Sequence, residues 1–325
     1  MDALDAGGQR GEIIWMTARA CSLVAILMCL FVLSDCRDRN DQRSESSRKS
    51  LPPVFPQAPA SNTNWDGAAG PVMLLSIGDA TDSAAVVLPE ATDSTLDSLS
   101  TAPDLRGRVF DLFGRGGSVG SSTAVLLATS PRSQSECISW PIARLTSGSS
   151  GWRVGFVHGD VRALALDSIE SLSSSDSAAL AASLTKSAAT LPVSSDPTFS
   201  KLPFRIRSAY TFKLDSTQAV IADVVRALNE EASPRIEHLF LVGERAAGTR
   251  EPFRIGYYSR VAGAEETIQA TEVLAVVEVG TTKRPAIVIG VESDEGVQLG
   301  LIEKNAPGLW RLAWTSANTD CEEPE

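Results

Sequence analysis

The chain has 325 residues, enough for one large domain or two ordinary ones, and a hydrophobic content of 43% is sufficient for a buried core. Its net charge of −11 argues against nucleic-acid binding, which needs a basic surface that releases counterions from phosphates. It has only two histidines, His158 and His238, so a histidine-rich metal or haem centre is not expected. We predict a globular protein without a cofactor or a metal site.

The segment from residue 1 to 36 carries a targeting signal. Residues 20–33 form an apolar run of 14 residues, which is about the length of the apolar core of a signal peptide. Counted from Ile13, the run reaches 21 residues and is long enough to span a membrane if Arg19 extends toward the headgroups. We interpret residues 1–36 as a signal anchor or a lipoprotein signal, and we expect a single N-terminal membrane helix in contact with membrane lipid.

The end of this segment holds a candidate for lipidation. The sequence Leu33-Ser34-Asp35-Cys36 resembles the lipobox of bacterial lipoproteins, in which the chain is cut before the cysteine and the cysteine is acylated. Asp35 departs from the small residue that the lipobox has at this position. Cys36 is therefore the lipidation candidate, while simple removal of the segment and its retention as a helix stay open.

Two signals disagree about the side of the membrane on which the globular part lies. Five basic residues follow the apolar run within residues 37–49, which by the positive-inside rule favours the cytoplasm. Cys137 and Cys321 are the only cysteines after residue 36, and such an even pair suits a disulfide in an oxidising compartment. We expect the periplasmic or extracellular side, with Cys137 and Cys321 as disulfide candidates and two unrelated thiols as the alternative.

Composition divides the rest of the chain into four parts. Residues 37–70 are polar and then proline-rich, which predicts an extended linker. Short apolar runs broken by turn residues indicate a first β unit at 71–172. Residues 173–200 contain an alanine-rich segment with a serine cap and a proline stop, which predicts a helical connector. A second β unit is expected at 201–325.

The second β unit contains one ambiguous segment. Its strand-like runs are joined by short turns and predict an antiparallel meander. Residues 216–231, STQAVIADVVRALNEE, place their apolar residues on one helical face, which favours a helix, although the β-branched content is also compatible with a strand. The predicted class is therefore mainly β (α+β), with antiparallel sandwich or meander units and one or two helices.

Two stretches resemble known families. Residues 281–316, TTKRPAIVIGVESDEGVQLGLIEKNAPGLWRLAWTS, are similar to the closing strands of FG-GAP or VCBS-type β repeats, and residues 167–244 resemble uncharacterised exported bacterial proteins of the lipoprotein kind. The calcium-binding DxDxDG loop of the repeats is missing at residues 281–283, so calcium binding does not carry over. The resemblance implies a β architecture and export, and it implies no reaction.

One glycine-rich stretch of the sequence matches a catalytic motif. Residues 116–120, GGSVG, match G-x-S-x-G, the nucleophile elbow that exposes a serine between a strand and a helix. The residues that follow read as a strand, so a glycine-rich hairpin is the preferred interpretation. Glu237 and His238 are adjacent, and neighbours on a strand point to opposite faces, so they are not expected to share a site. We predict no catalytic residue and no enzymatic activity.

These observations favour a non-catalytic, membrane-tethered accessory or scaffolding subunit. Its partners would be the protein subunits of an envelope membrane complex on the exported side, for example an electron-transfer or photosynthetic complex. One alternative is an envelope serine hydrolase that uses Ser118 and His158. A second alternative is a surface lipoprotein that binds glycan or cell-wall material through exposed tryptophans, namely Trp140, Trp152, Trp310 or Trp314.

Overall fold

The structure is a computed structural model that describes residues 71–78, 80–87, 105–128, 140–192, 196–228, 234–265, 267–280, 282–293 and 296–316. The predicted signal segment with Cys36, the linker, Cys137 and Cys321 lie outside the described residues. Within those ranges no helix has the length and apolar content needed to cross a membrane. The described fold is mainly β with antiparallel strand pairing, as the sequence predicts.

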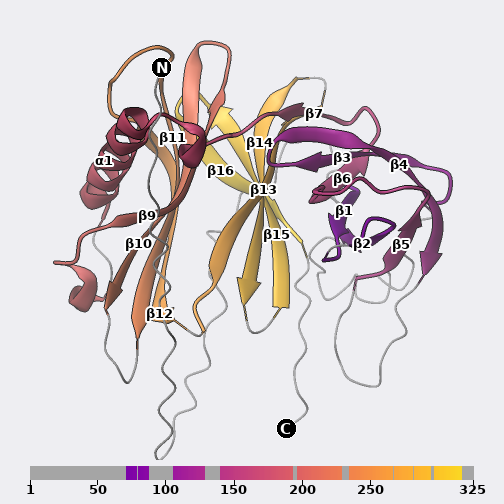
Figure 1. The fold of residues 1–325 in the computed structure, drawn as a ribbon, viewed down its shortest axis with the longest axis horizontal. Helices are drawn as coiled ribbons and strands as arrows, with labels where there is room; N and C mark the ends of the chain where they lie inside the picture. Colours follow the sequence, from indigo (N-terminus) through magenta and orange to yellow (C-terminus); the bar gives the residue numbers. More distant parts are fainter. Residues whose placement is uncertain are drawn as a thin grey trace, which may run out of the picture. The chain divides into compact units, whose positions relative to one another are not determined.

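The first strands close into an antiparallel barrel in the order β1-β2-β5-β4-β3-β6 (Figure 1). The strands are β1 (Met73–Ser76), β2 (Ser83–Val87), β3 (Val109–Gly114), β4 (Gly117–Ala128), β5 (Ile142–Leu145) and β6 (Val154–Val157). The barrel is filled by alternate residues of these strands, including Leu74, Phe110 and Leu112, which are fully buried. Closure leaves no free strand edge between β1 and β6, which pair directly.

Two five-stranded antiparallel sheets make up the rest of the β structure. The first sheet has the order β12-β11-β10-β9-β8, and the second has the order β16-β15-β14-β13-β7. The first contains β8 (Asp167–Ser168), β9 (Arg205–Lys213), β10 (Thr217–Leu228), β11 (Arg235–Ala246) and β12 (Arg254–Ala264). The second contains β7 (Val161–Leu164), β13 (Ala270–Val279), β14 (Arg284–Ser293), β15 (Gly296–Ala306) and β16 (Leu309–Thr315).

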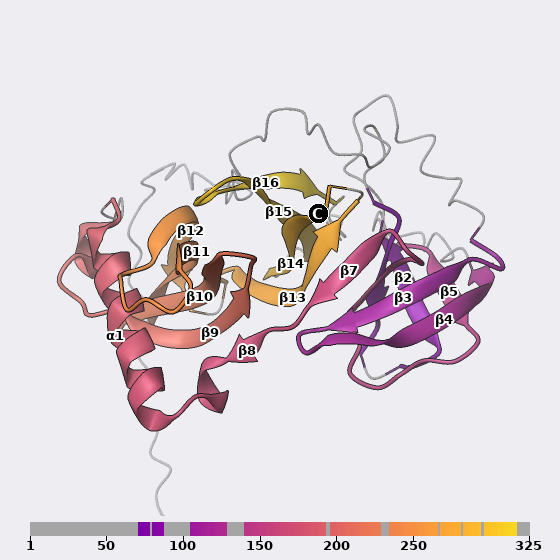
Figure 2. The same ribbon diagram turned by 90° about the horizontal axis from the view of Figure 1, so that it is seen from above.

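One α-helix, α1 (Ser174–Thr190), lies between β8 and β9 in the described chain, with short 3₁₀ turns η2 (Ile169–Ser171) and η3 (Pro197–Phe199) on either side. Ser173 caps α1 by accepting a hydrogen bond from the backbone N–H of Asp176 at 3.2 Å. Leu180 and Leu184 point inward from the helix and pack on β9, β10 and β11 of the first sheet. Figure 2 shows α1 beside β9 and β10 from above.

The helix favoured for residues 216–231 is wrong, because residues 217–228 form strand β10. β10 pairs along its length with β11 on one side and with β9 on the other. Adjacent residues Val220 and Ile221 are both fully buried, Val220 beneath α1 and Ile221 against the second sheet. A strand covered on both faces is apolar at consecutive positions, so its sequence loses the alternation that identifies a half-buried strand.

The described elements pack as successive layers. The two sheets pack face to face through Ile221 and Val242 of the first sheet and Ile287 and Ile302 of the second. The opposite face of the second sheet packs against barrel residues that include Phe156, together with further apolar residues of β1, β2, β3 and β6. Both large sheets are therefore buried on both faces, the first between α1 and the second sheet, and the second between the first sheet and the barrel.

Candidate functional site

Ser118 lies in a hairpin and not in a nucleophile elbow. Strands β3 and β4 pair directly, with Gly114 opposite Gly117 and Phe113 opposite Ser118. Gly117 has a φ of 109°, a left-handed value that suits glycine at the start of the returning strand. The serine is followed by strand β4 and not by a helix, so it has neither the strand-to-helix turn nor the helix N-terminus that supports a serine nucleophile.

His158 follows β6 and pairs with Asp111 of β3. Its Nδ1 lies 2.8 Å from Asp111 Oδ1, and the backbone N–H of Gly159 donates to Asp111 Oδ2 at 3.1 Å. The hydrogen bond that His158 donates to Asp111 and the charge of this carboxylate raise the pKa of His158 above its ordinary value of 6.5. The imidazole is well exposed, so this is a surface ion pair on the outside of the barrel.

The structure does not bring Ser118 and His158 together. The backbone N–H of His158 donates to Val109 O at one end of β3, whereas Ser118 pairs with Phe113 at the other end. These two positions on β3 are separated by roughly 13 Å at the usual rise per residue, and β4 and β6 flank β3 on opposite sides. The serine therefore has no histidine within reach in this arrangement.

Glu237 and His238 point to opposite faces of β11, as the alternation of a strand predicts. His238 is buried toward the second sheet, where its Nδ1 lies 3.2 Å from both carboxylate oxygens of Asp223. Arg207 Nη1 donates to Asp223 Oδ2 at 3.4 Å. Glu237 instead lies on the α1 side of the sheet and belongs to a different cluster of charges.

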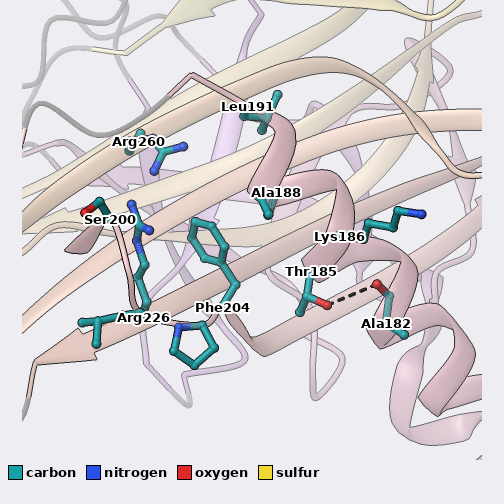
Figure 3. A pocket seen from close by; sticks show the side chains of 12 residues that line it. Ala182, Thr185, Lys186, Ala188, Leu191, Ser200, Phe204, Arg226 and Arg260 are labelled. Carbon is teal, nitrogen blue, oxygen red and sulfur yellow. Dashed lines mark hydrogen bonds between the residues drawn. The ribbon is translucent and has the colours of Figure 1, made fainter. Parts of the chain in front are cut away.

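A pocket of about 470 Å³ opens on the α1 side of the first sheet (Figure 3). It lies between the second half of α1, the chain leading into β9, and strands β10 and β12. Its apolar lining includes Ala182, Ala188, Leu191, Leu202, Pro203 and Phe204. Its cationic side chains are Lys186, Arg226 and Arg260. In Figure 3, Phe204 lies between Arg226 and the helix, while Lys186 points away from both arginines.

The two arginines share one buried carboxylate. Glu237 has no exposed surface, and Arg226, which is only 5% exposed, donates from its Nε to Glu237 Oε2. Arg260 Nη1 lies 3.0 Å from the same oxygen, as an ion pair without hydrogen-bond geometry, and Arg260 Nη2 donates to Pro192 O at 2.9 Å. Two positive charges therefore meet one negative charge at the base of the pocket.

Phe204 gives these cations an aromatic neighbour. The guanidinium carbon of Arg226 lies 4.6 Å from the centre of the Phe204 ring, and that of Arg260 lies 5.9 Å from it. Contacts at these distances stabilise a cation over the ring face, more strongly where water is excluded. The ring also separates the charged base of the pocket from the alanines of α1, so the site has a cationic end and an apolar wall.

This site was not predicted from the sequence. Arg226 sits inside an apolar run, and its pairing with Glu237 depends on the register of β10 and β11, in which these residues are direct partners. Arg260 joins them from β12, next to Leu239 of β11. The signal that could have indicated the site was Arg226, an arginine inside a mostly apolar segment. A buried arginine requires an anionic partner, so its presence there predicts a buried carboxylate nearby.

No cluster of three or more histidine, cysteine, aspartate or glutamate side chains that could hold a metal ion occurs among the described residues. Comparisons with models of protein families, with curated proteins and with solved structures gave no match. The function of this chain is therefore inferred from its own geometry.

Proposed function

We propose that the chain is a non-catalytic accessory or scaffolding subunit, held at a membrane by its N-terminal segment. In this proposal it binds the protein subunits of a membrane complex on the exported side, such as an electron-transfer or photosynthetic complex. The observation that carries the proposal is the use of charged side chains as internal links between layers of the body. A protein whose role is to hold its partners in place needs such rigidity.

Glu244 is the clearest of these links. Its Oε1 accepts a hydrogen bond from Trp310 Nε1 at 2.7 Å, and its Oε2 accepts from Lys304 Nζ at 2.9 Å. The carboxylate belongs to β11 of the first sheet, whereas both donors belong to β15 and β16 of the second. A buried carboxylate with a cation and an indole N–H as donors is well satisfied, so its role is to join the two sheets.

Arg115 links the barrel to the second sheet in the same way. It lies at the tip of the β3–β4 hairpin, pairs with Glu272 of β13, and donates from Nε to Val273 O at 2.8 Å. Its guanidinium carbon also lies 5.6 Å from the centre of the Tyr210 ring of β9. One side chain thus touches the barrel and both sheets, which restrains their relative movement.

The two alternatives have no such support. The hydrolase alternative needs Ser118 next to His158, but these residues pair with opposite ends of β3, Ser118 with Phe113 and His158 with Val109. The glycan-binding alternative needs exposed indoles, but Trp140, Trp152 and Trp310 are at most 4% exposed and Trp314 is half-buried in the core next to the barrel.

The proposal is tested by the native size of the endogenous protein after mild detergent extraction of its source membranes. We expect stable co-migration with a defined set of membrane proteins, which mass spectrometry of the same band would identify. A single particle near the monomer mass of 34.4 kDa, with no companion protein, would overturn the proposal.

A second arm of this experiment examines the tether. The Cys36→Ser variant removes the sulfur that would be acylated in the lipobox-like sequence. If acylation holds the protein, this variant is released from the membrane fraction. If the apolar run is retained as a helix, the variant stays in it. Release of the unmodified protein from the membrane fraction without detergent would contradict both kinds of tether, the acylated cysteine and the retained helix.

A further inference from the structure

We propose that the pocket between α1 and strands β10 and β12 binds a small organic carboxylate whose apolar part lies against Phe204 and the alanines of α1. This goes beyond the proposed function, because it assigns a small-molecule site to a protein proposed to act by binding protein partners. The balance of charge, the free donors of Arg226 and the chemistry of the pocket walls support this assignment.

The balance of charge leaves one positive charge in excess at the base of the pocket. Arg226 and Arg260 both pair with Glu237, and the side chain of Arg260 is only 14% exposed. Charged groups withdrawn from water are costly unless they are compensated, and Glu237 compensates only one of the two guanidinium groups. A bound ligand with a single negative charge would complete the cluster, whereas a neutral or cationic ligand would not.

Arg226 has donors left to hold that charge. Its Nε is used by Glu237, and no acceptor among the described residues hydrogen-bonds its two terminal nitrogens. The side chain is nine-tenths buried and lines the pocket. In Figure 3 its guanidinium group and that of Arg260 point into the same part of the pocket, near Ser200. A planar carboxylate can accept two parallel hydrogen bonds from such a group.

The walls favour an organic acid over inorganic phosphate. Apart from the arginines, the lining next to the cationic end is mostly apolar, and the hydroxyl of Ser200 there already donates to Pro197 O at 2.7 Å, so it is not available for the extra oxygens of a phosphate. A phosphate would also bring up to two negative charges where one is needed. The volume of about 470 Å³ falls within the usual range of small-molecule sites and leaves room for a ring or a short chain.

The probe for the first experiment is phenylacetate, titrated by calorimetry into the full-length chain in mild detergent. We expect saturable binding of one phenylacetate per chain. Phenylacetamide and acetate should each bind at least about tenfold more weakly. Phenylacetamide lacks the negative charge that pairs with the arginines, and acetate lacks the ring that packs against the apolar wall. Equal binding of phenylacetamide, or tighter binding of inorganic phosphate, would overturn the proposal.

The variant Arg226→Gln removes the donor pair and leaves Glu237 paired with Arg260, so the base of the pocket becomes neutral. We expect it to lose phenylacetate affinity by about tenfold or more. Arg245→Gln is the matched control, because Arg245 also lies over a phenylalanine, 4.3 Å from the ring of Phe253, but does not line the pocket. Retained affinity in Arg226→Gln, or equal losses in both variants, would overturn the proposal.

A second variant covers the case in which Arg226→Gln does not fold. Ala189 is exposed at the rim of the pocket, so Ala189→Trp should fold normally and obstruct the opening. Loss of phenylacetate binding in Ala189→Trp supports the site, and unchanged binding overturns it. These titrations need no partner complex, so their outcome is independent of whether the endogenous protein co-migrates with one.

Discussion

Of the two histidines of the chain, one is exposed and the other is buried, and each lies beside an aspartate. His158 is exposed beside Asp111, and its pKa is raised by that carboxylate. His238 is buried beside Asp223. Their adjacent acids were not visible in the sequence, because each acid comes from a different strand and meets its histidine only through the register of the sheet.

We predict that Asp111→Asn lowers the pKa of His158 toward 6.5, because the variant removes the charge that favours the imidazolium ion. The measurement is an NMR titration of the His158 imidazole C–H signals, which are assigned by their loss in the His158→Gln variant. A His158 titration that is the same in the variant would contradict the ion pair.

The same pair has a defined effect on stability. A histidine whose pKa is raised in the folded state stabilises the protein at pH values below the unfolded pKa, and this contribution is lost as the pH rises through the folded pKa. The pH range over which this stabilisation is lost therefore begins near pH 6.5 and extends upward. Because His158 is exposed, the effect should be small and reduced by salt.

Glu244 allows a prediction about the link between the sheets. Its replacement by alanine would leave the buried Trp310 Nε1 and the partly buried Lys304 without their acceptor, which should cost about 2–4 kcal/mol of the free energy of unfolding. Urea unfolding gives this number, and Glu244→Gln should lose less because its amide oxygen still accepts from the indole. Glu292→Ala, at an exposed site, is the control, and a Glu244→Ala variant within about 0.5 kcal/mol of it would refute the link.

At the scale of the elements, a glycine sets the contact between the open edges of the two sheets. Gly256 of β12 lies where the pairing of β11 with β12 shifts register between Val242 and Gly243. A Cβ added there would lie 2.4 Å from Gly308 O, in the turn between β15 and β16. That atom is a backbone oxygen, so it cannot turn aside as the end of a flexible side chain could.

We predict that Gly256→Ala destabilises the protein by about 1–3 kcal/mol, because either β12 or the turn must move. Gly263 of the same strand is the matched control, since a Cβ there would meet no atom within 4 Å. Thermal unfolding of the two variants side by side measures the difference. If Gly256→Ala and Gly263→Ala unfold at the same temperature, β12 does not approach the turn as closely as described.

The sequence predicted most elements correctly, and its principal error has a physical cause. Strands β9 and β11 to β16 correspond to runs that read as strands, and α1 was recognised from its serine cap, its alanine content and the proline that follows. Strand β10 was favoured as a helix because it is buried on both faces. Residues 219–226 are buried at every position, so the segment has no period of two, and its β-branched residues were the better indication.

At the scale of the whole molecule, the sequence could not predict how α1, the two sheets and the barrel pack against one another. The barrel depends on the pairing of β1 with β6, and the second sheet depends on the pairing of β7 with β13, two strands about a hundred residues apart. The pocket depends on such pairings as well, since its arginines come from β10 and β12 and its apolar wall from α1. Local patterns carry no information about these contacts.

The layered arrangement predicts that the barrel and the two sheets unfold as one cooperative body. Val276 and Val277 are neighbours on β13, and both are almost fully buried, but Val276 faces the first sheet and Val277 faces the barrel. Because the second sheet cannot lose either cover without exposing apolar surface, Val276→Ala and Val277→Ala should each weaken the whole body by about 2–3 kcal/mol. Val125→Ala, at a side chain that is 49% exposed, is the control and should change little.

Native-state hydrogen exchange measures this, because it reports the opening free energy of each strand separately. In both buried variants, the most protected amides of β6 in the barrel and of β10 in the first sheet should lose protection by the same amount. If Val277→Ala lowered protection in the barrel alone, the barrel would open independently and the layers would be separate folding units. Equal losses would mean that α1, the two sheets and the barrel open together with one free energy of unfolding. A partner bound to any one layer would then stabilise all of them.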